Sequence, residues 1–395
     1  MRLIACWVVT TVVISGCASN VTPTSAPRAL PVPKPLQSII DHPDAPTDDT
    51  IEVFICDVPP ETSDPMYGDL PLRLTLEPTV VAEQMEAGSR PYFEALSHGR
   101  YHPHFVAGAV LSMSGTETHG ECVERALDES SPSTTVVMVV ATAEDIATES
   151  GGWGRPGSPC ARPPCPAAAT RRAMYVGASD FYDADKPGHI SQAPLLDLIE
   201  HEIGHTLDLP HSGLPGTQYT SPLDVMSNSA APRDTQPDRI NAQDTLGINR
   251  LALGWMPPSA VAVAGPDGGT FELSPSTGAA ALRLLVLPID DSQFLTVELL
   301  SATGFDDALP QSGVALHLVD QAATVCGHPS PTELCTGVDR RQTLIVPGGE
   351  QPELIAHAGE TNSYGAAGRG WTIVLRSDVT DAARTAQVEV HATDG

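Results

Sequence analysis

Positive charge is scarce in this sequence: 21 lysines and arginines stand against 49 aspartates and glutamates, and the formal net charge is -28. Such a surface repels the phosphates of nucleic acids and the anionic headgroups of lipids. We therefore expect no nucleic-acid partner, and any attachment to a membrane must depend on something other than surface charge. The sequence also lacks repeats of a fixed period, which disfavours the repeat architectures.

A long apolar run is missing as well. The run at residues 3–14 follows a single cation, Arg2, and is too short to span a membrane stably. This pattern is typical of a secretory signal peptide, which we place at residues 1–16. The letters ISGC that end at Cys17 resemble the bacterial lipobox, so we expect Cys17 to be lipidated and to anchor the protein in a bacterial cell envelope, facing outward. An ordinary signal peptide with a chance cysteine is the alternative.

Cysteine pairs of the C-x-x-C type are absent, which disfavours a zinc site built from thiolates. Of the eight cysteines, one lies in the signal peptide and Cys17 takes lipid, which leaves six. An even number in an exported chain predicts three disulfides among Cys56, Cys122, Cys160, Cys165, Cys326 and Cys335. Six cysteines allow 15 pairings. The short-loop candidates are Cys160 with Cys165 and Cys326 with Cys335, which leave Cys56 for Cys122.

The segment 17–49 holds seven prolines and few large apolar residues. This composition predicts an extended, unfolded tether, largely of polyproline type, between the lipid and the folded part of the chain. With 395 residues, the chain is long enough for two medium domains beyond this tether.

Strand and helix patterns alternate between residues 50 and 257. Runs rich in β-branched residues predict strands at 50–58, 133–143 and 173–179, and apolar periodicity predicts helices at 78–96 and 193–207. The Gly- and Pro-rich stretch 151–166 predicts a loop. This order favours an α/β layer with a twisted mixed sheet.

The pattern changes at residue 258. From there to residue 395, short apolar runs are separated by turn residues, which predicts an all-β sandwich. We place the domain boundary between residues 257 and 258, at two consecutive prolines.

The stretch EHEIGHTLDLPHSG, residues 200–213, concentrates histidine at a predicted helix end. His201 and His205 lie one turn apart on the same helix face, so both imidazoles can reach one cation. Glu202 is rotated by about 100° from His201, which suits a base acting on metal-bound water better than a ligand. The alternative is a polar helix end that happens to be rich in histidine.

A third ligand can come from His211 if the chain turns back after the helix. Asp208 is among the few non-glycine residues that accept a left-handed conformation, and Pro210 prevents the helix from continuing. Three histidines and a water molecule make a catalytic zinc site.

This pattern resembles the extended zinc motif of the metzincin metalloproteases. Its residues here are His201, Glu202, His205, Asp208 and His211. Members of that family have a methionine in a tight turn beneath the zinc, and SPLDVMSN offers Met226 for this role, with an ordinary buried methionine as the alternative. The family usually has glycine at the position of Asp208, a departure that puts activity more in question than zinc binding.

Within the metzincins, the chain is most similar to the gametolysin-like group, on the strings at 97–101 and 240–256. The similarity covers residues 50–257. It implies a metzincin-like catalytic domain that binds Zn2+ and cleaves peptide bonds of extracytoplasmic proteins, with Glu202 as the general base. It also implies a substrate that pairs in extended form with an exposed strand edge.

Weaker candidates remain. Calcium could bind Asp180, Asp183 and Asp185, although these do not match an EF-hand and a solvated turn is the commoner outcome. A second metal site could involve His98, His102 and His104, with an ordinary surface loop as the alternative. Tyr219 could assist the developing oxyanion. The competing function is a surface lipoprotein that uses zinc structurally and binds or adheres without catalysis. In either case we expect the protein to be a monomer.

Overall fold

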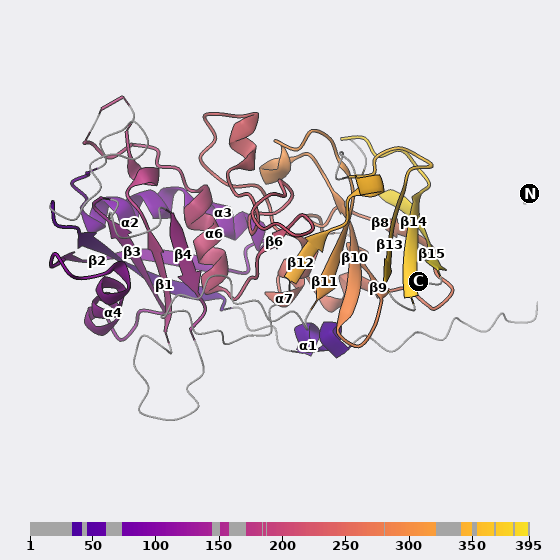
Figure 1. The fold of residues 1–395 in the computed structure, drawn as a ribbon, viewed down its shortest axis with the longest axis horizontal. Coiled ribbons are helices and arrows are strands. Elements are labelled where there is room, and N and C mark those ends of the chain that lie inside the picture. Colours follow the sequence, from indigo (N-terminus) through magenta and orange to yellow (C-terminus); the bar gives the residue numbers. More distant parts are fainter. Residues whose placement is uncertain are drawn as a thin grey trace, which may run out of the picture.

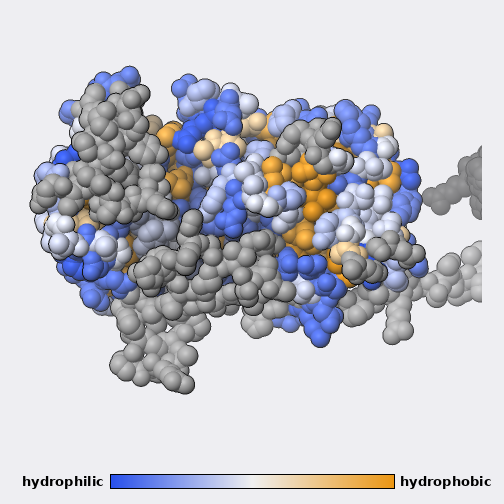
Figure 2. All heavy atoms as spheres, viewed as in Figure 1, coloured by the Kyte–Doolittle hydropathy of each residue, from blue (hydrophilic) through white to orange (hydrophobic). Residues whose placement is uncertain are grey.

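The fold is described by a computed structural model. The described residues are 34–41, 46–60, 73–143, 151–157, 171–183, 185–186, 188–279, 281–320, 341–349, 354–366, 369–381 and 384–393. They form a mixed α/β structure whose first half is built around one sheet and whose second half is built around two (Figure 1). Hydrophilic residues cover much of the visible outline, and the hydrophobic residues that show gather mainly over the β-rich second half (Figure 2).

The first half contains a five-stranded mixed sheet in the order β2-β1-β3-β5-β4. Its parallel strands are β1 (Asp48–Asp57), β2 (His102–Ser112), β3 (Val136–Ala141) and β5 (Arg172–Val176). The edge strand β4 (Gly152–Arg155) runs antiparallel to β5. The α/β layer is thus confirmed, whereas the expectation of a loop over 151–166 is wrong for Gly152–Arg155.

Helices cover both faces of this sheet, because β1 alternates its apolar side chains between them. Ile51, Val53 and Ile55 share a core with α2 (Pro78–Ala87), α3 (Ser89–Leu96) and α6 (Asp197–Thr206). On the other face, Phe54 and Cys56 share a core with α4 (His119–Glu129).

The single helix expected over 78–96 is divided into α2 and α3 at Gly88. A Cβ atom at this position would lie 2.2 Å from the Cδ1 atom of Leu196, just before α6. A glycine is needed here for close approach rather than for a positive φ, because it leaves room for the side chain of Leu196 where α2 meets α3.

The second half contains a six-stranded sheet in the order β6-β12-β11-β10-β9-β7 and an antiparallel sheet in the order β13-β14-β15-β8. The strands of the larger sheet are β6 (Ser212–Gly213), β7 (Val261–Val263), β9 (Leu284–Pro288), β10 (Gln293–Leu300), β11 (Gly313–Asp320) and β12 (Arg341–Leu344). Those of the smaller sheet are β8 (Gly269–Leu273), β13 (Thr361–Ala366), β14 (Arg369–Leu375) and β15 (Ala386–Thr393). Both sheets contribute side chains to one hydrophobic core.

Two features cross the expected boundaries. Strand β6, which lies before residue 257 in sequence, pairs in parallel with β12 of the second half. Residues Lys34–Asp41 form helix α1, where we expected an unfolded tether. Leu36 and Ile39 of α1 are 0% and 4% exposed and pack in a cluster that includes α7 (Gly247–Ala252) and β9. No helix in the described part of the chain has both the length and the apolar character needed to cross a membrane.

Candidate metal centre

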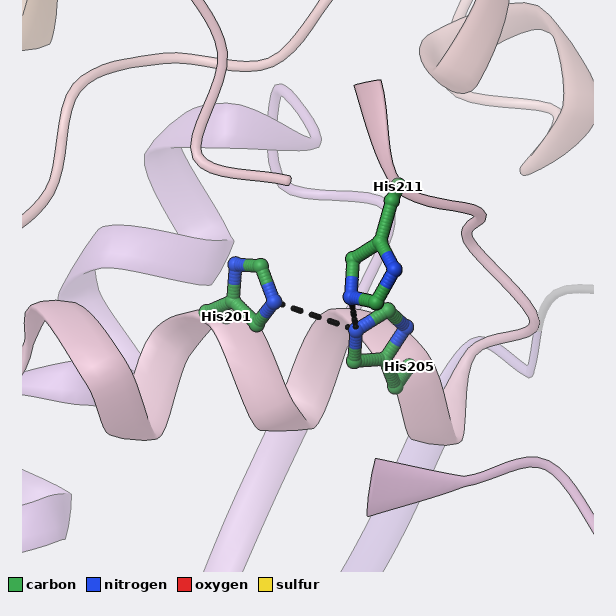
Figure 3. A group of neighbouring side chains, drawn as sticks. All are labelled: His201, His205 and His211. Carbon is green, nitrogen blue, oxygen red and sulfur yellow. Dashed lines mark hydrogen bonds between the residues drawn. The ribbon is translucent and has the colours of Figure 1, made fainter. Parts of the chain in front are cut away.

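The end of helix α6 turns the chain back on itself. Asp208 has a φ of 64°, the left-handed conformation expected from the sequence. Its N–H donates to the carbonyl of His205 (3.0 Å), and the N–H of Leu209 donates to the carbonyl of Gly204 (3.1 Å). These two bonds form a Schellman motif, which satisfies the last carbonyls of the helix. The reversal places His211 beside the helix that it has just left (Figure 3).

The three histidines converge on one point. The Nε2 atom of His205 lies 3.1 Å from Nε2 of His201 and 2.7 Å from Nε2 of His211. One ligand atom from each residue lies within 4.8 Å of the others. Figure 3 shows the three rings turned toward one another, two from the helix and one from the returning chain. Such a group can hold a metal ion.

Backbone carbonyls fix the tautomers of the two helix histidines. Nδ1 of His201 lies 2.7 Å from the carbonyl oxygen of Val225, and Nδ1 of His205 lies 2.8 Å from that of Leu209. A carbonyl can only accept a hydrogen bond, so both Nδ1 atoms donate. In the neutral ring, the proton on Nδ1 leaves Nε2 with its lone pair, as a metal ligand requires.

Burial keeps these rings neutral. It lowers the pKa of His201 to about 4, and it lowers the pKa of His205 well below its usual value. Converging lone pairs on neutral imidazoles repel one another unless a cation lies between them. The donor set therefore fits a divalent metal that accepts nitrogen ligands, such as Zn2+.

Met226 lies in a tight turn against α6. The N–H of Ser227 donates to the carbonyl of Asp224 (2.9 Å), which closes the turn. Met226 is 0% exposed, and a Cβ atom on Gly204 would lie 2.4 Å from its sulfur. The glycine of the motif therefore lets the methionine pack directly on the helix between the two histidines. The preceding residue, Val225, supplies the carbonyl that orients His201.

Glu202 is enclosed between α6 and the edge strand β4. It is 3% exposed, and its Oε2 atom has no hydrogen-bond partner among the described residues. Burial raises the pKa of Glu202 well above its usual value; nearby Asp180 raises it further, and the Gly154 N–H opposes this. A divalent cation at the histidines would favour the charged carboxylate and oppose this rise.

Two glycines of β4 allow this enclosure. A Cβ atom on Gly154 would lie 2.2 Å from the carbonyl oxygen of Glu202, and one on Gly152 would lie 3.0 Å from its Cγ atom. At these two positions, the strand therefore faces helix α6 with backbone atoms alone, because glycine has no side chain.

Tyr219 reaches the site from the loop that follows β6. Its hydroxyl lies 2.9 Å from Nε2 of His211, the atom that faces the other two histidines, and the residue is 47% exposed. The residue has a φ of 59°, a left-handed conformation that is unusual for tyrosine. The phenol is thus held within reach of both the solvent and the histidine cluster.

The weaker metal candidates do not form clusters. Among the described residues, the group of His201, His205 and His211 is the one with three close ligand atoms. His102 instead lies 3.2 Å from Glu94, and His104 lies 3.1 Å from Arg90. Asp183 accepts a hydrogen bond from the N–H of Asp185 (3.0 Å), as in an ordinary turn.

One predicted disulfide is present. Cys56 of β1 is bonded to Cys122 of α4 across 66 residues. Cys17, Cys160, Cys165, Cys326 and Cys335 lie outside the described residues. Sequence reasoning missed the orienting carbonyls of Val225 and Leu209 and the close approach of β4. For β4, the repeated glycine of GWG was a usable signal.

Comparison of the sequence with models of protein families found no match. Comparison with curated proteins found none either.

Proposed function

We propose that the protein is a zinc-dependent endopeptidase of metzincin type that hydrolyses peptide bonds of extracytoplasmic proteins. The observation that carries this proposal is the convergence of three imidazole Nε2 atoms next to a helix residue, Glu202, that is buried and only partly hydrogen-bonded. A purely structural metal site has no need of a buried carboxyl group at this position.

The residues suit metal-assisted hydrolysis. Bound Zn2+ would supply an acidic water molecule and a Lewis acid for the scissile carbonyl. Glu202 would take the proton from the attacking water and pass it to the leaving amine. Its enclosure by β4 excludes bulk water from the proton that it carries. The hydroxyl of Tyr219 can donate to the oxygen on which negative charge develops.

Strand β4 offers a place for an extended substrate. It is an edge strand that pairs with β5 alone within the described residues, and it lies directly against α6. A peptide that adds to this edge by main-chain hydrogen bonds would pass beside Glu202.

The expected location is the outside of a bacterial cell. The disulfide between Cys56 and Cys122 supports an oxidising compartment. We propose that lipid on Cys17 anchors a monomeric enzyme to the envelope, because the formal charge of -28 does not favour anionic headgroups.

The proposal is tested with the purified chain from residue 18 onward. We expect about one Zn2+ per chain, cleavage of a protein library, loss of cleavage with a chelator and its recovery with Zn2+. Glu202→Gln should retain the metal and lower kcat/KM by at least about a hundredfold. Glu83→Gln, an exposed carboxylate on α2, is the matched control.

Two results would contradict this function. Cleavage that persists at full rate in Glu202→Gln would exclude the general-base role. Stoichiometric Zn2+ without turnover of any protein in the library would favour the alternative, a surface lipoprotein with structural zinc and a binding or adhesion role.

A further inference from the structure

We infer that the β-rich second half holds the third histidine in place, through a buried hydrogen-bond chain from β12 to the residue that follows His211. This inference rests on the proposed metal centre. It assigns Gln342, Asn249 and Asp224 as positioning residues, which act on the site without touching it.

The backbone after His211 is part of the sheet of the second half. Ser212 and Gly213 pair in parallel with Gln342 and Thr343 of β12, and Figure 1 shows β6 and β12 next to each other between the two halves. The N–H of Ser212 also donates to the carbonyl of Met226 (3.0 Å). His211 is therefore held on one side by the Schellman turn and on the other by this strand pairing.

Side-chain hydrogen bonds add to this backbone link between β6 and β12. Gln342 Nε2 donates to Asn249 Oδ1 (2.7 Å), and Asn249 Nδ2 donates to Asp224 Oδ2 (3.4 Å). The hydroxyls of Ser212 and Thr245 donate to the two oxygens of Asp224 (2.6 and 3.0 Å). Together these bonds form a chain from Gln342 of β12 through Asn249 of α7 to Asp224, which binds the hydroxyl of Ser212, the residue after His211.

All of these polar groups are buried. Asp224 is 0% exposed, Asn249 is 1% exposed, and Ser212 and Gln342 are each 2% exposed. A buried polar group without its partner loses more free energy than the bond itself contributes, so the groups are expected to hold one arrangement. Asp224 has a double role, because the turn that it begins also carries the Val225 carbonyl that orients His201. Loss of the chain should therefore disturb two ligands together.

The expected size of the effect depends on how many residues lie between Gln342 and the histidine ligand. Replacing groups that orient a ligand directly lowers metal affinity by about 10- to 100-fold. Gln342 acts through Asn249 and Asp224, so we expect about a tenfold loss, at the lower end of that range.

The test uses Co2+ alone as a probe, with the purified chain from residue 18 onward. Gln342→Met keeps the length of the side chain and removes its hydrogen bond. We expect a Kd for Co2+ that is about tenfold higher than in the wild type, together with weaker visible absorption as a histidine is replaced by water. The matched control is Gln293→Met, because the Gln293 amide donates to Asp320 (2.8 Å) in the same sheet, away from the site. The control should bind Co2+ like the wild type.

The outcomes separate the two proposals. Gln342→Met with the Kd and spectrum of Gln293→Met would overturn the positioning role alone. A wild-type chain that binds no Co2+ would overturn the metal centre itself. If Gln342→Met fails to fold, Thr245→Val removes another bond to Asp224 at constant shape, and the same rise in Kd is expected; an unchanged Kd there would also overturn the inference.

Discussion

The backbone at Asp208 reverses the chain so that His211 returns to helix α6. Its φ of 64° is a conformation that costs most residues about 1–2 kcal/mol. Aspartate tolerates it because a short polar side chain can bond locally, and this is why the histidine after the helix could be predicted as a ligand from sequence. Residue type and spacing decide this reversal, so the sequence contains the information directly.

Replacing Asp208 by alanine and by glycine should show how much the left-handed backbone conformation costs. We expect Asp208→Ala to lower the free energy of unfolding by about 1 kcal/mol, because alanine keeps the Cβ atom and has no polar group to compensate. Asp208→Gly should change it little, since relief of strain is offset by a more flexible unfolded chain. Urea denaturation of both variants checks this. An alanine variant as stable as the wild type would show that the left-handed backbone is not limiting.

Gly204 should be sensitive to a single methyl group. A Cβ atom there would lie 2.4 Å from the sulfur of Met226, and overpacking of this kind typically costs about 1–3 kcal/mol. The displaced turn would also move the Val225 carbonyl away from His201. We therefore expect Gly204→Ala to lower both stability and Zn2+ affinity, measured by denaturation and chelator competition. Gly265→Ala is the control, because its Cβ atom would meet no described residue within 4 Å. Equal effects in both variants would refute the packing argument.

At the scale of elements, the sequence predicted those with strong periodicity and missed those that depend on partners. Strands β1, β3 and β5 and helix α6 overlap the segments whose apolar patterns indicated them. Strand β4 has only four residues, two of them glycine, so its pairing with β5 is set by the sheet rather than by local preference. Helix α1 was not predicted, because the neighbouring prolines favour an extended chain.

Helix α1 should contribute measurably to stability. Leu36 is 0% exposed in a cluster with α7 and β9, and replacing a buried leucine by alanine costs about 2–5 kcal/mol in a core. At this peripheral site, we expect Leu36→Ala to lower the free energy of unfolding by about 2 kcal/mol. Gln37→Ala, on the exposed side of the same helix, serves as the reference in urea denaturation. If the two variants unfold at the same urea concentration, the helix does not dock in solution.

At the scale of the whole molecule, strand pairing joins residues on either side of position 257, where the change in sequence pattern predicted a domain boundary. Strand β6 belongs to the larger sheet of the second half. Residues of α7 also meet that sheet, since the Gly247 N–H donates to Glu298 of β10 (2.8 Å). Such contacts depend on how distant segments meet, and no local pattern encodes them.

The disulfide between Cys56 and Cys122 should stabilise the first half. It joins β1 to α4 across 66 residues, on the sheet face opposite α6. Cross-links of this kind typically contribute about 2–4 kcal/mol. We expect the double variant Cys56→Ala, Cys122→Ala to lose about this much in denaturation and to keep its Zn2+ affinity, because the bond lies away from the histidines. Loss of metal binding at temperatures where the variant is folded would contradict that separation.

The contact between the halves should make stability depend on pH. Burial raises the pKa of Glu298 from 4.5 to about 7; nearby Asp224 adds to the rise, while the Gly247 N–H, the hydroxyl of Ser276 and the charge of Arg250 oppose it. The folded chain then binds the proton more tightly than the unfolded chain does. Between about pH 4.5 and 7, this group must make the free energy of unfolding fall as pH rises, by up to about 3 kcal/mol.

Glu298→Gln removes this proton and keeps an oxygen that can accept from Gly247. The variant should therefore be more stable than the wild type at pH 8, and the difference should shrink toward pH 5, where Glu298 is protonated in the folded state. Urea denaturation of both proteins at the two pH values measures it. Because other buried acids such as Asp224 titrate in both proteins, only the difference between them reports on Glu298. A difference independent of pH would mean that the pKa of this carboxyl group is the same in the folded and the unfolded chain.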